Sequence, residues 1–300
     1  YLANVGKMTI AEDGAITTEL ISTADVSDAA VAATAEAWIN DVDAMLGEQI
    51  ATTDIKFYIN DPAAGKRRIR MGETNLGDFV ADGIYTYFNE IEELHCDVAI
   101  MNGGGIRTDV NAGQVDLQDL QAGQPLRQCG LPDVCYRQAD PGCSGVRRPL
   151  RRPGGKENGG FLHVAGATYE IHTDIPNTVL TDDKNVWMGS ATGTPRVQNV
   201  RIYNRKTGTY EPLDLNRTYA LAGMNYTLRN LGDGFAMFDG AELIKDYVSE
   251  DYLVMSSYAA MFGGVDATVC RIWQVPTARW PITPATCSTT RTRTAQAASR

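Results

Sequence analysis

The feature that most constrains this chain is a strand-like run that passes directly into a glycine-rich loop ending in arginine. The segment reads Asp97-Val-Ala-Ile-Met101, then Asn102-Gly103-Gly104-Gly105-Ile106-Arg107. Three glycines allow a sharp turn and leave successive backbone N–H groups accessible, an arrangement that binds anions. Arg107 could add two parallel hydrogen bonds to a phosphate. On these residues alone, a tight turn followed by a surface arginine explains the pattern equally well.

A second candidate anion-binding element precedes a predicted helix. Lys66 and Arg70 lie four residues apart, and Thr74 or Asn75 is placed to cap the helix that follows. Basic side chains near a helix N-terminus could converge on one anion. The alternative is a solvated basic run without a ligand.

A third candidate element combines an aromatic residue with an acidic turn. Tyr226 precedes the loop Gly232-Asp233-Gly234. The ring could stack on a base, and the carboxylate could accept hydrogen bonds from ribose hydroxyls. A core tyrosine and a turn aspartate form the alternative interpretation.

Hydrophobic periodicity predicts both helices and strands along the chain. The predicted elements are a hairpin over 1–22, a helix over 25–50 capped by Ser27, a helix from 74 or 75, strands over 161–172, 196–205 and 218–224, and a helix over 242–261.

Composition and motifs exclude several classes. With 27 Lys+Arg against 37 Asp+Glu, the net charge of −10 argues against a nucleic-acid partner. No apolar run approaches the ~18 residues that span a bilayer. No cluster of metal ligands, nucleophile elbow or Walker motif is present. We expect structural roles for the isolated His95, His163 and His172.

Taken together and in this order, the motifs resemble the C-terminal domain of the 5'-nucleotidase family. The matching stretches are 70–82, 97–107, 157–166 and 225–238. The resemblance implies a multilayer α+β domain with mixed sheets over 56–262, a linker helix over 25–55, and the end of a preceding metallophosphatase domain over 1–24. We therefore expect the chain to be a fragment.

The resemblance also implies roles for individual residues. Arg70 and Arg107 match arginines that hold the substrate phosphate, and Lys66 falls where some members have another arginine. Asn102 and the glycines after it line the substrate site. Asp233 matches the carboxylate that takes the ribose hydroxyls, and Tyr226 lies near a base-stacking aromatic, one residue further from Asp233 than usual.

Residues 126–157 depart from the family pattern. Where the family has Pro-Phe-Gly-Asn, Pro125 is followed by Leu126-Arg-Gln128. One choice of codons for these residues, read one base later, restores Phe-Gly-Asn, and residues 135–140 and 145–148 behave similarly. We expect a frameshifted segment here, with a lineage-specific insertion as the alternative. We expect residues 263–300 to be an aberrant or disordered tail.

The family implies hydrolysis of phosphate from nucleoside 5'-monophosphates or related nucleotides. Two divalent metal ions and the catalytic residues would belong to the N-terminal domain, so we expect neither in this chain. The alternatives are a nucleotide-binding fragment without catalysis or a non-functional product. The family also implies an extracellular, periplasmic or cell-wall location, while the oligomeric state stays open.

Overall fold

The computed structural model divides the chain into two compact units, Tyr1–Glu48 and Gln49–Arg300. It describes residues 3–24, 27–47, 49–53, 55–60, 65, 67–123, 129–131, 135–137, 157–172, 174–190, 192–245, 248–260 and 287–289. Apart from the two short strands at 129–131 and 135–137 and Glu157, the segment predicted to be frameshifted lies outside the described residues. So does the predicted tail, apart from 287–289.

The first unit contains the predicted hairpin and a helix. Strands β1 (Asn4–Ile10) and β2 (Ile16–Ser22) pair antiparallel, with Ile10 opposite Ile16. Helix α1 (Ala29–Leu46) is capped by Asp28 and not by the predicted Ser27, because the Asp28 Oδ1 accepts hydrogen bonds from the N–H groups of Ala30 and Val31.

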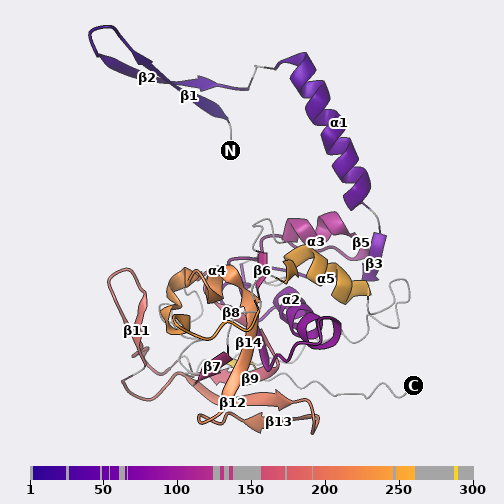
Figure 1. The fold of residues 1–300 in the computed structure, drawn as a ribbon, viewed down its shortest axis with the longest axis vertical. Coiled ribbons are helices and arrows are strands. Elements are labelled where there is room, and N and C mark those ends of the chain that lie inside the picture. Colours follow the sequence, from indigo (N-terminus) through magenta and orange to yellow (C-terminus); the bar gives the residue numbers. More distant parts are fainter. Residues whose placement is uncertain are drawn as a thin grey trace. The chain divides into compact units, whose positions relative to one another are not determined.

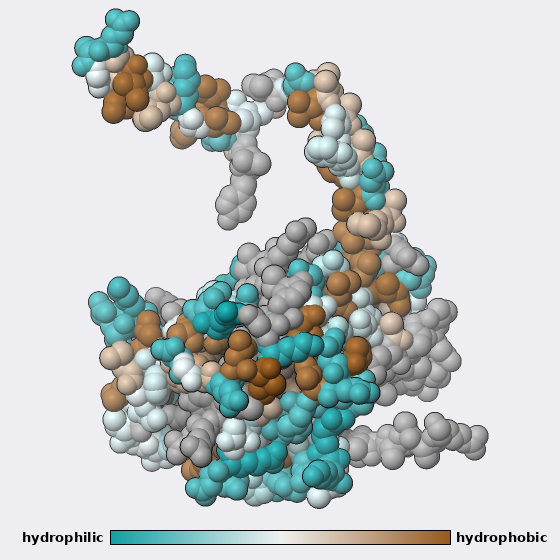
Figure 2. Space-filling model, viewed as in Figure 1, coloured by the Kyte–Doolittle hydropathy of each residue, from teal (hydrophilic) through white to brown (hydrophobic). Residues whose placement is uncertain are grey.

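Apolar side chains of the first unit are exposed along both elements, as the brown surfaces in Figure 2 show. The apolar stripe predicted for the helix contains Val31, Trp38, Val42 and Met45. The side chain of Trp38 is 68% exposed, and α1 has no buried residue. The predicted spacing of apolar residues therefore gives a helix whose apolar stripe is exposed.

The second unit (Figure 1) is built on a mixed sheet, in which β4 (Val98–Asn102) has an inner position. Strand β4 runs parallel to β14 (Thr218–Met224) and antiparallel to β8 (Leu162–Ala165). The backbones of β6 (Cys129–Leu131), β7 (Cys135–Arg137) and β15 (Ser249–Glu250) extend the sheet beyond β14. This arrangement places the loop after β4 beside the chain that enters β8.

Smaller sheets complete this unit. The order β13 (Thr209–Pro212), β12 (Val197–Asn204), β9 (Ala167–Ile171) and β16 (Cys287–Thr289) forms one sheet. Two further pairs are β3 (Gln49–Thr53) with β5 (Gly113–Asp116), and β10 (Leu180–Thr181) with β11 (Trp187–Gly189). The range predicted as a linker helix, 25–55, thus also contains β3, which pairs within the second unit.

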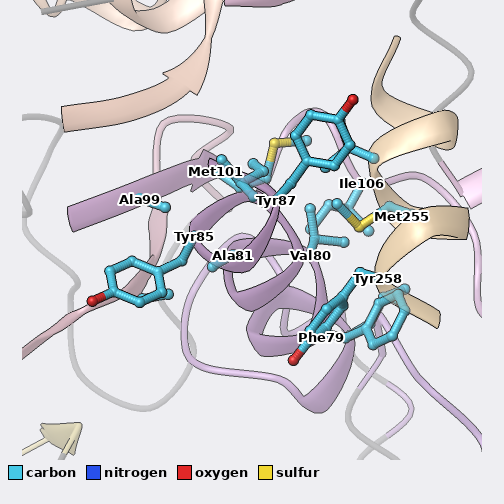
Figure 3. Packing of buried hydrophobic residues seen from close by; sticks show 14 of the residues in the cluster. Phe79, Val80, Ala81, Tyr85, Tyr87, Ala99, Met101, Ile106, Met255 and Tyr258 are labelled. Carbon is cyan, nitrogen blue, oxygen red and sulfur yellow. The ribbon is translucent and has the colours of Figure 1, made fainter. Parts of the chain in front are cut away.

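The main core lies between the large sheet and its helices. Helix α2 (Asn75–Thr86), continued by a π-helical turn (Tyr87–Ile91), packs against β4, β8 and α5 (Asp251–Ala260). Thr74 caps α2 by accepting a hydrogen bond from the Gly77 N–H. Figure 3 shows Met255 and Tyr258 of α5 beside Val80 and Phe79 of α2. Short helices α3 (Leu117–Gly123) and α4 (Asn225–Leu228) follow β5 and β14.

The helix predicted over 242–261 is wrong in its first half. Helix α5 begins at Asp251, and the preceding Ser249–Glu250 pairs with β6 as β15. Leu243 and Ile244 have helical spacing but are each 46% exposed. Sheet pairing therefore overrides local periodicity here. No described helix has the length and apolarity needed to cross a membrane.

Candidate functional site

The backbone of the arginine segment is held from three directions. Arg68 and Ile69 both donate backbone hydrogen bonds to the Ile59 carbonyl, at 2.8 and 2.9 Å. The Nε2–H of His163 in β8 donates to the Ile69 carbonyl at 2.9 Å. The Asn158 N–H donates to the Arg70 carbonyl at 3.0 Å. Arg70 therefore projects from a fixed backbone, and His163 has the structural role predicted for it.

The three glycines after β4 work differently from the prediction. Their N–H groups do not face a ligand: Gly103 donates to the Phe161 carbonyl, Gly104 to that of Gly159, and Gly105 to that of Asn102. A Cβ at Gly103 would lie 2.1 Å from the Ile69 carbonyl oxygen. The glycines therefore let three backbone segments approach one another. The predicted nest of free N–H groups is wrong, because the chain before β8 accepts from the first two donors and the Asn102 carbonyl of the same turn accepts from the third.

Three guanidinium groups gather beside this crossing. Arg67, Arg70 and Arg107 each have a buried Nε with no hydrogen-bond partner among the described residues. Burial lowers the pKa of Arg70, as do the charges of Arg67 and Arg107, while the carboxylates of Glu157 and Asp233 oppose that change. Buried donors without partners are uncommon in folded proteins, and here they carry positive charge. The arrangement is suited to a multivalent anion.

Asp233 approaches the arginines from the loop after α4. It lies in the 3₁₀ turn Gly232–Gly234 with a left-handed backbone, φ +57°. A Cβ at Gly159 would lie 3.7 Å from the Asp233 Oδ2. The carboxylate thus faces the glycine-rich chain before β8, on the same side as Arg70.

Tyr226 is packed against that loop. A Cβ at Gly232 would lie 2.5 Å from ring atoms of Tyr226, so the phenol ring rests on the glycine backbone. The Tyr226 side chain is half-buried. Only part of the ring is left to meet a ligand, and its predicted stacking on a base stays a prediction.

The hairpin β10–β11 supports the Asp233 loop from behind. Gly234 has φ +85°, and a Cβ there would lie 2.4 Å from the Asn185 carbonyl oxygen. Trp187 packs on the cluster that contains Phe235 and Phe238. The Asp233 loop is therefore packed between this hairpin and the chain before β8.

The structure brings together three of the predicted site residues, Arg70, Arg107 and Asp233. Asn102, also predicted, is buried at the end of β4, where its Oδ1 accepts a 3.5 Å hydrogen bond from the Thr227 hydroxyl. Lys66 lies outside the described residues.

Sequence reasoning missed Arg67 and Glu157. Arg67 belongs to the same basic run as Arg70, three residues before it, whereas Arg68 between them donates its Nε–H to the Glu73 carbonyl at 2.8 Å. The Glu157 Oε2 lies 3.9 Å from an Nη1 of both Arg67 and Arg70. The signal for Glu157 was its place at the start of the 157–166 motif.

The described residues hold no group of three or more His, Cys, Asp or Glu side chains arranged to bind a metal ion. They do not supply a two-metal centre, which the family resemblance assigns to a preceding domain.

A family model described as 5'-nucleotidase, C-terminal domain, matches residues 49–129 and 147–240. Residues 130–146, which separate the two matched ranges, lie within the segment predicted to be frameshifted. The match covers both the arginine segment and the Asp233 loop.

Named relatives agree with this match. The 5'-nucleotidase of Rattus norvegicus is 27% identical over 240 residues, covering 77% of this chain and 37% of that protein. Protein UshA of Yersinia enterocolitica is 26% identical over 223 residues, covering 73% of this chain and 33% of its own length. This chain thus spans little more than a third of these relatives.

Solved structures share the fold. A 5'-nucleotidase precursor from Thermus thermophilus has a TM-score of 0.58 at 22% identity, covering 88% of this chain and 48% of that one. The NAD nucleotidase of Haemophilus influenzae has a TM-score of 0.53 at 18% identity, covering 87% and 46%. At these identities the likeness concerns the fold alone.

Proposed function

Because this chain belongs to the 5'-nucleotidase C-terminal domain family, we propose that it is the substrate-binding half of a metal-dependent phosphohydrolase acting on nucleoside 5'-monophosphates or related nucleotides. The observation that carries this proposal is the convergence of Arg70 and Arg107, with buried Nε donors, near the Asp233 carboxylate. One end of such a site suits a phosphate and the other suits hydroxyl groups.

Each side chain has a distinct task in this proposal. Arg70 and Arg107 bind phosphate oxygens through charge-assisted hydrogen bonds. Asp233 accepts hydrogen bonds from the ribose hydroxyls, and the part of the Tyr226 ring that Gly232 leaves open contacts the base. The nucleotide is thereby oriented, with its phosphate fixed at the arginines.

The hydrolytic step needs groups beyond the described residues. This chain matches only about a third of the length of these relatives. We assign the two divalent metals to that remainder, where they would supply an activated water for attack on phosphorus. From the family resemblance we also propose a location outside the cytoplasm, as for a secreted enzyme.

Calorimetric titration of AMP into the whole chain tests the binding part. We expect saturable binding that Arg107→Ala weakens by about 10–100-fold, since hydrogen bonds to charged groups contribute roughly 1.5–3 kcal/mol. Arg201→Ala, on the exposed face of β12, is the matched control and should bind as the parent chain does. Equal binding by the Arg107 variant would rule out this phosphate site.

The hydrolytic part has a separate test. A version extended to the length of the relatives should release phosphate from AMP when Mn²⁺, Co²⁺ or Zn²⁺ is supplied. Absence of release from every nucleotide tried, with AMP binding intact, would favour the second candidate function, a nucleotide-binding module without catalysis. That alternative rests on the absence of a metal-binding group among the described residues.

A further inference from the structure

Glu157 lies between two of the arginines without forming a close ion pair with either. Its Oε2 is 3.9 Å from Nη1 of Arg67 and 3.9 Å from Nη1 of Arg70, and its side chain is 43% exposed. These distances exceed those of a hydrogen bond, which end near 3.2 Å for N–H···O. Glu157 therefore adds negative charge to the site and leaves the guanidinium donors available to a ligand.

Backbone hydrogen bonds place this residue beside the arginine segment. The N–H of the next residue, Asn158, donates to the Arg70 carbonyl at 3.0 Å, and the Phe161 N–H donates to the Asn158 carbonyl at 3.1 Å. Glu157 is thus fixed to the same backbone that carries Arg70.

The local charge balance depends on this residue. Arg67, Arg70 and Arg107 contribute three positive charges, and Glu157 and Asp233 contribute two negative charges, which leaves a formal +1. Without Glu157 the sum would be +2. Because a nucleoside diphosphate carries more negative charge than a monophosphate, lowering the sum from +2 to +1 weakens the attraction of the site for the diphosphate more than for the monophosphate.

We infer that Glu157 is a specificity-determining residue, which reduces the advantage that the arginines would otherwise give to ligands with a longer phosphate chain over ligands with a singly phosphorylated end. This inference rests on the proposed function, because it takes the arginines to be the phosphate site. Glu157 touches neither the reacting atoms nor the base. It acts through the electrostatic potential at the arginines.

A purely structural role of Glu157 predicts the opposite change in affinity when its charge is removed. If Glu157 served mainly to align Arg67 and Arg70, its neutralisation would loosen both arginines and weaken every phosphate ligand. If it acts as a counter-charge, neutralisation strengthens binding, and more so for the more highly charged ligand. The isosteric change Glu157→Gln separates the two roles because it keeps the side-chain shape.

The experiment is calorimetric titration of AMP, ADP and inorganic phosphate into the whole chain, its Glu157→Gln variant, and Glu92→Gln as control. Glu92 forms an ion pair with Lys245 at 3.1 Å and is not part of the site. We expect Glu157→Gln to tighten AMP binding about threefold to tenfold and ADP binding further, and both gains to shrink in 0.5 M NaCl, where the Debye length falls to roughly 4 Å. The control should match the parent chain.

Two results overturn the inference. Equal or weaker binding of AMP and ADP by Glu157→Gln contradicts the counter-charge role, as does an equal gain for both ligands. Arg107→Ala, titrated in parallel, separates this failure from failure of the proposed function. If Arg107→Ala abolishes AMP binding while Glu157→Gln changes nothing, only the inference fails. If AMP does not bind the parent chain, or Arg107→Ala binds it equally well, the phosphate site itself is wrong and the inference falls with it.

Discussion

The imidazole of His163 donates a hydrogen bond to the carbonyl oxygen of Ile69, 2.9 Å away, and both residues are almost completely buried. The two lie 94 residues apart in the chain. This contact ties β8 to the residue immediately before Arg70. It makes the position of Arg70, the proposed phosphate-binding side chain, depend on a buried histidine in β8.

Replacing His163 by alanine should therefore affect stability and binding together. The change leaves the Ile69 carbonyl buried without its partner and opens a cavity, which we expect to lower the free energy of unfolding by about 2–4 kcal/mol. His95→Ala is the control, because the His95 side chain is 64% exposed. Urea unfolding of both variants measures the effect, and equal midpoints would contradict it.

Substitution of Gly103 by alanine tests the close approach of the loop after β4 to the arginine segment. The new Cβ would lie 2.1 Å from the Ile69 carbonyl oxygen, which belongs to the backbone and cannot rotate away. We expect destabilisation of about 1–3 kcal/mol or more, as for overpacked cores. Gly189→Ala is the control, because its Cβ would come no closer than 3.5 Å to a Leu180 side-chain atom, which is an ordinary contact. This variant should unfold at nearly the parent midpoint.

Removal of the Asp233 carboxylate should separate recognition of the nucleoside from recognition of phosphate. With Asp233→Ala, we expect AMP binding to weaken by about 5–100-fold as the hydrogen bonds to the ribose are lost. Inorganic phosphate should bind equally or more tightly, since the Asp233 charge acts on Arg70. Parallel titrations with the two ligands measure this, and a matching loss for both would contradict the assigned role.

Asp251 should make stability depend on pH. Burial at the start of α5 raises the pKa of this carboxyl to about 7 in the folded protein from its ordinary value of 3.8. The folded state then binds more protons than the unfolded state between these values, so Asp251 lowers stability as pH rises from about 4 to 7. The cost above pH 7 is at most on the order of 4 kcal/mol, from about 1.4 kcal/mol per pKa unit.

Asp251→Asn should accordingly stabilise the chain at pH 8 relative to the parent and have little effect at pH 4. Exposed Asp239→Asn is the matched control. Urea unfolding at pH 4, 6 and 8 gives the comparison. A difference between parent and Asp251→Asn that does not grow with pH would show that the carboxyl does not titrate in this way.

Several elements followed from local sequence. Alternation of side chains and a Gly14 turn suffice for the hairpin β1–β2, and the predicted strand Thr218–Met224 coincides with β14. The motifs around Arg70, Arg107 and Asp233 also identified residues that the structure brings together. These features rest on periodicity and on residue types within short windows, which a sequence displays directly.

Other features were decided only by contacts between distant segments. The N–H groups of the three glycines are taken by Phe161, Gly159 and Asn102, so the loop packs where a nest was expected. The start of α5 was set by pairing of the preceding residues with β6.

The choice among neighbouring charged residues was likewise made by tertiary structure. Arg67 reaches the cluster and Arg68 does not, although both belong to one basic run. Glu157 meets Arg70 because the Asn158 N–H reaches the Arg70 carbonyl. Sequence alone determined which charged groups this protein offers to an anion. Hydrogen bonding between β4, β8 and the arginine segment determined which of these groups converge. The direction of each side chain depends on its backbone, and that backbone is held by partners far apart in the chain.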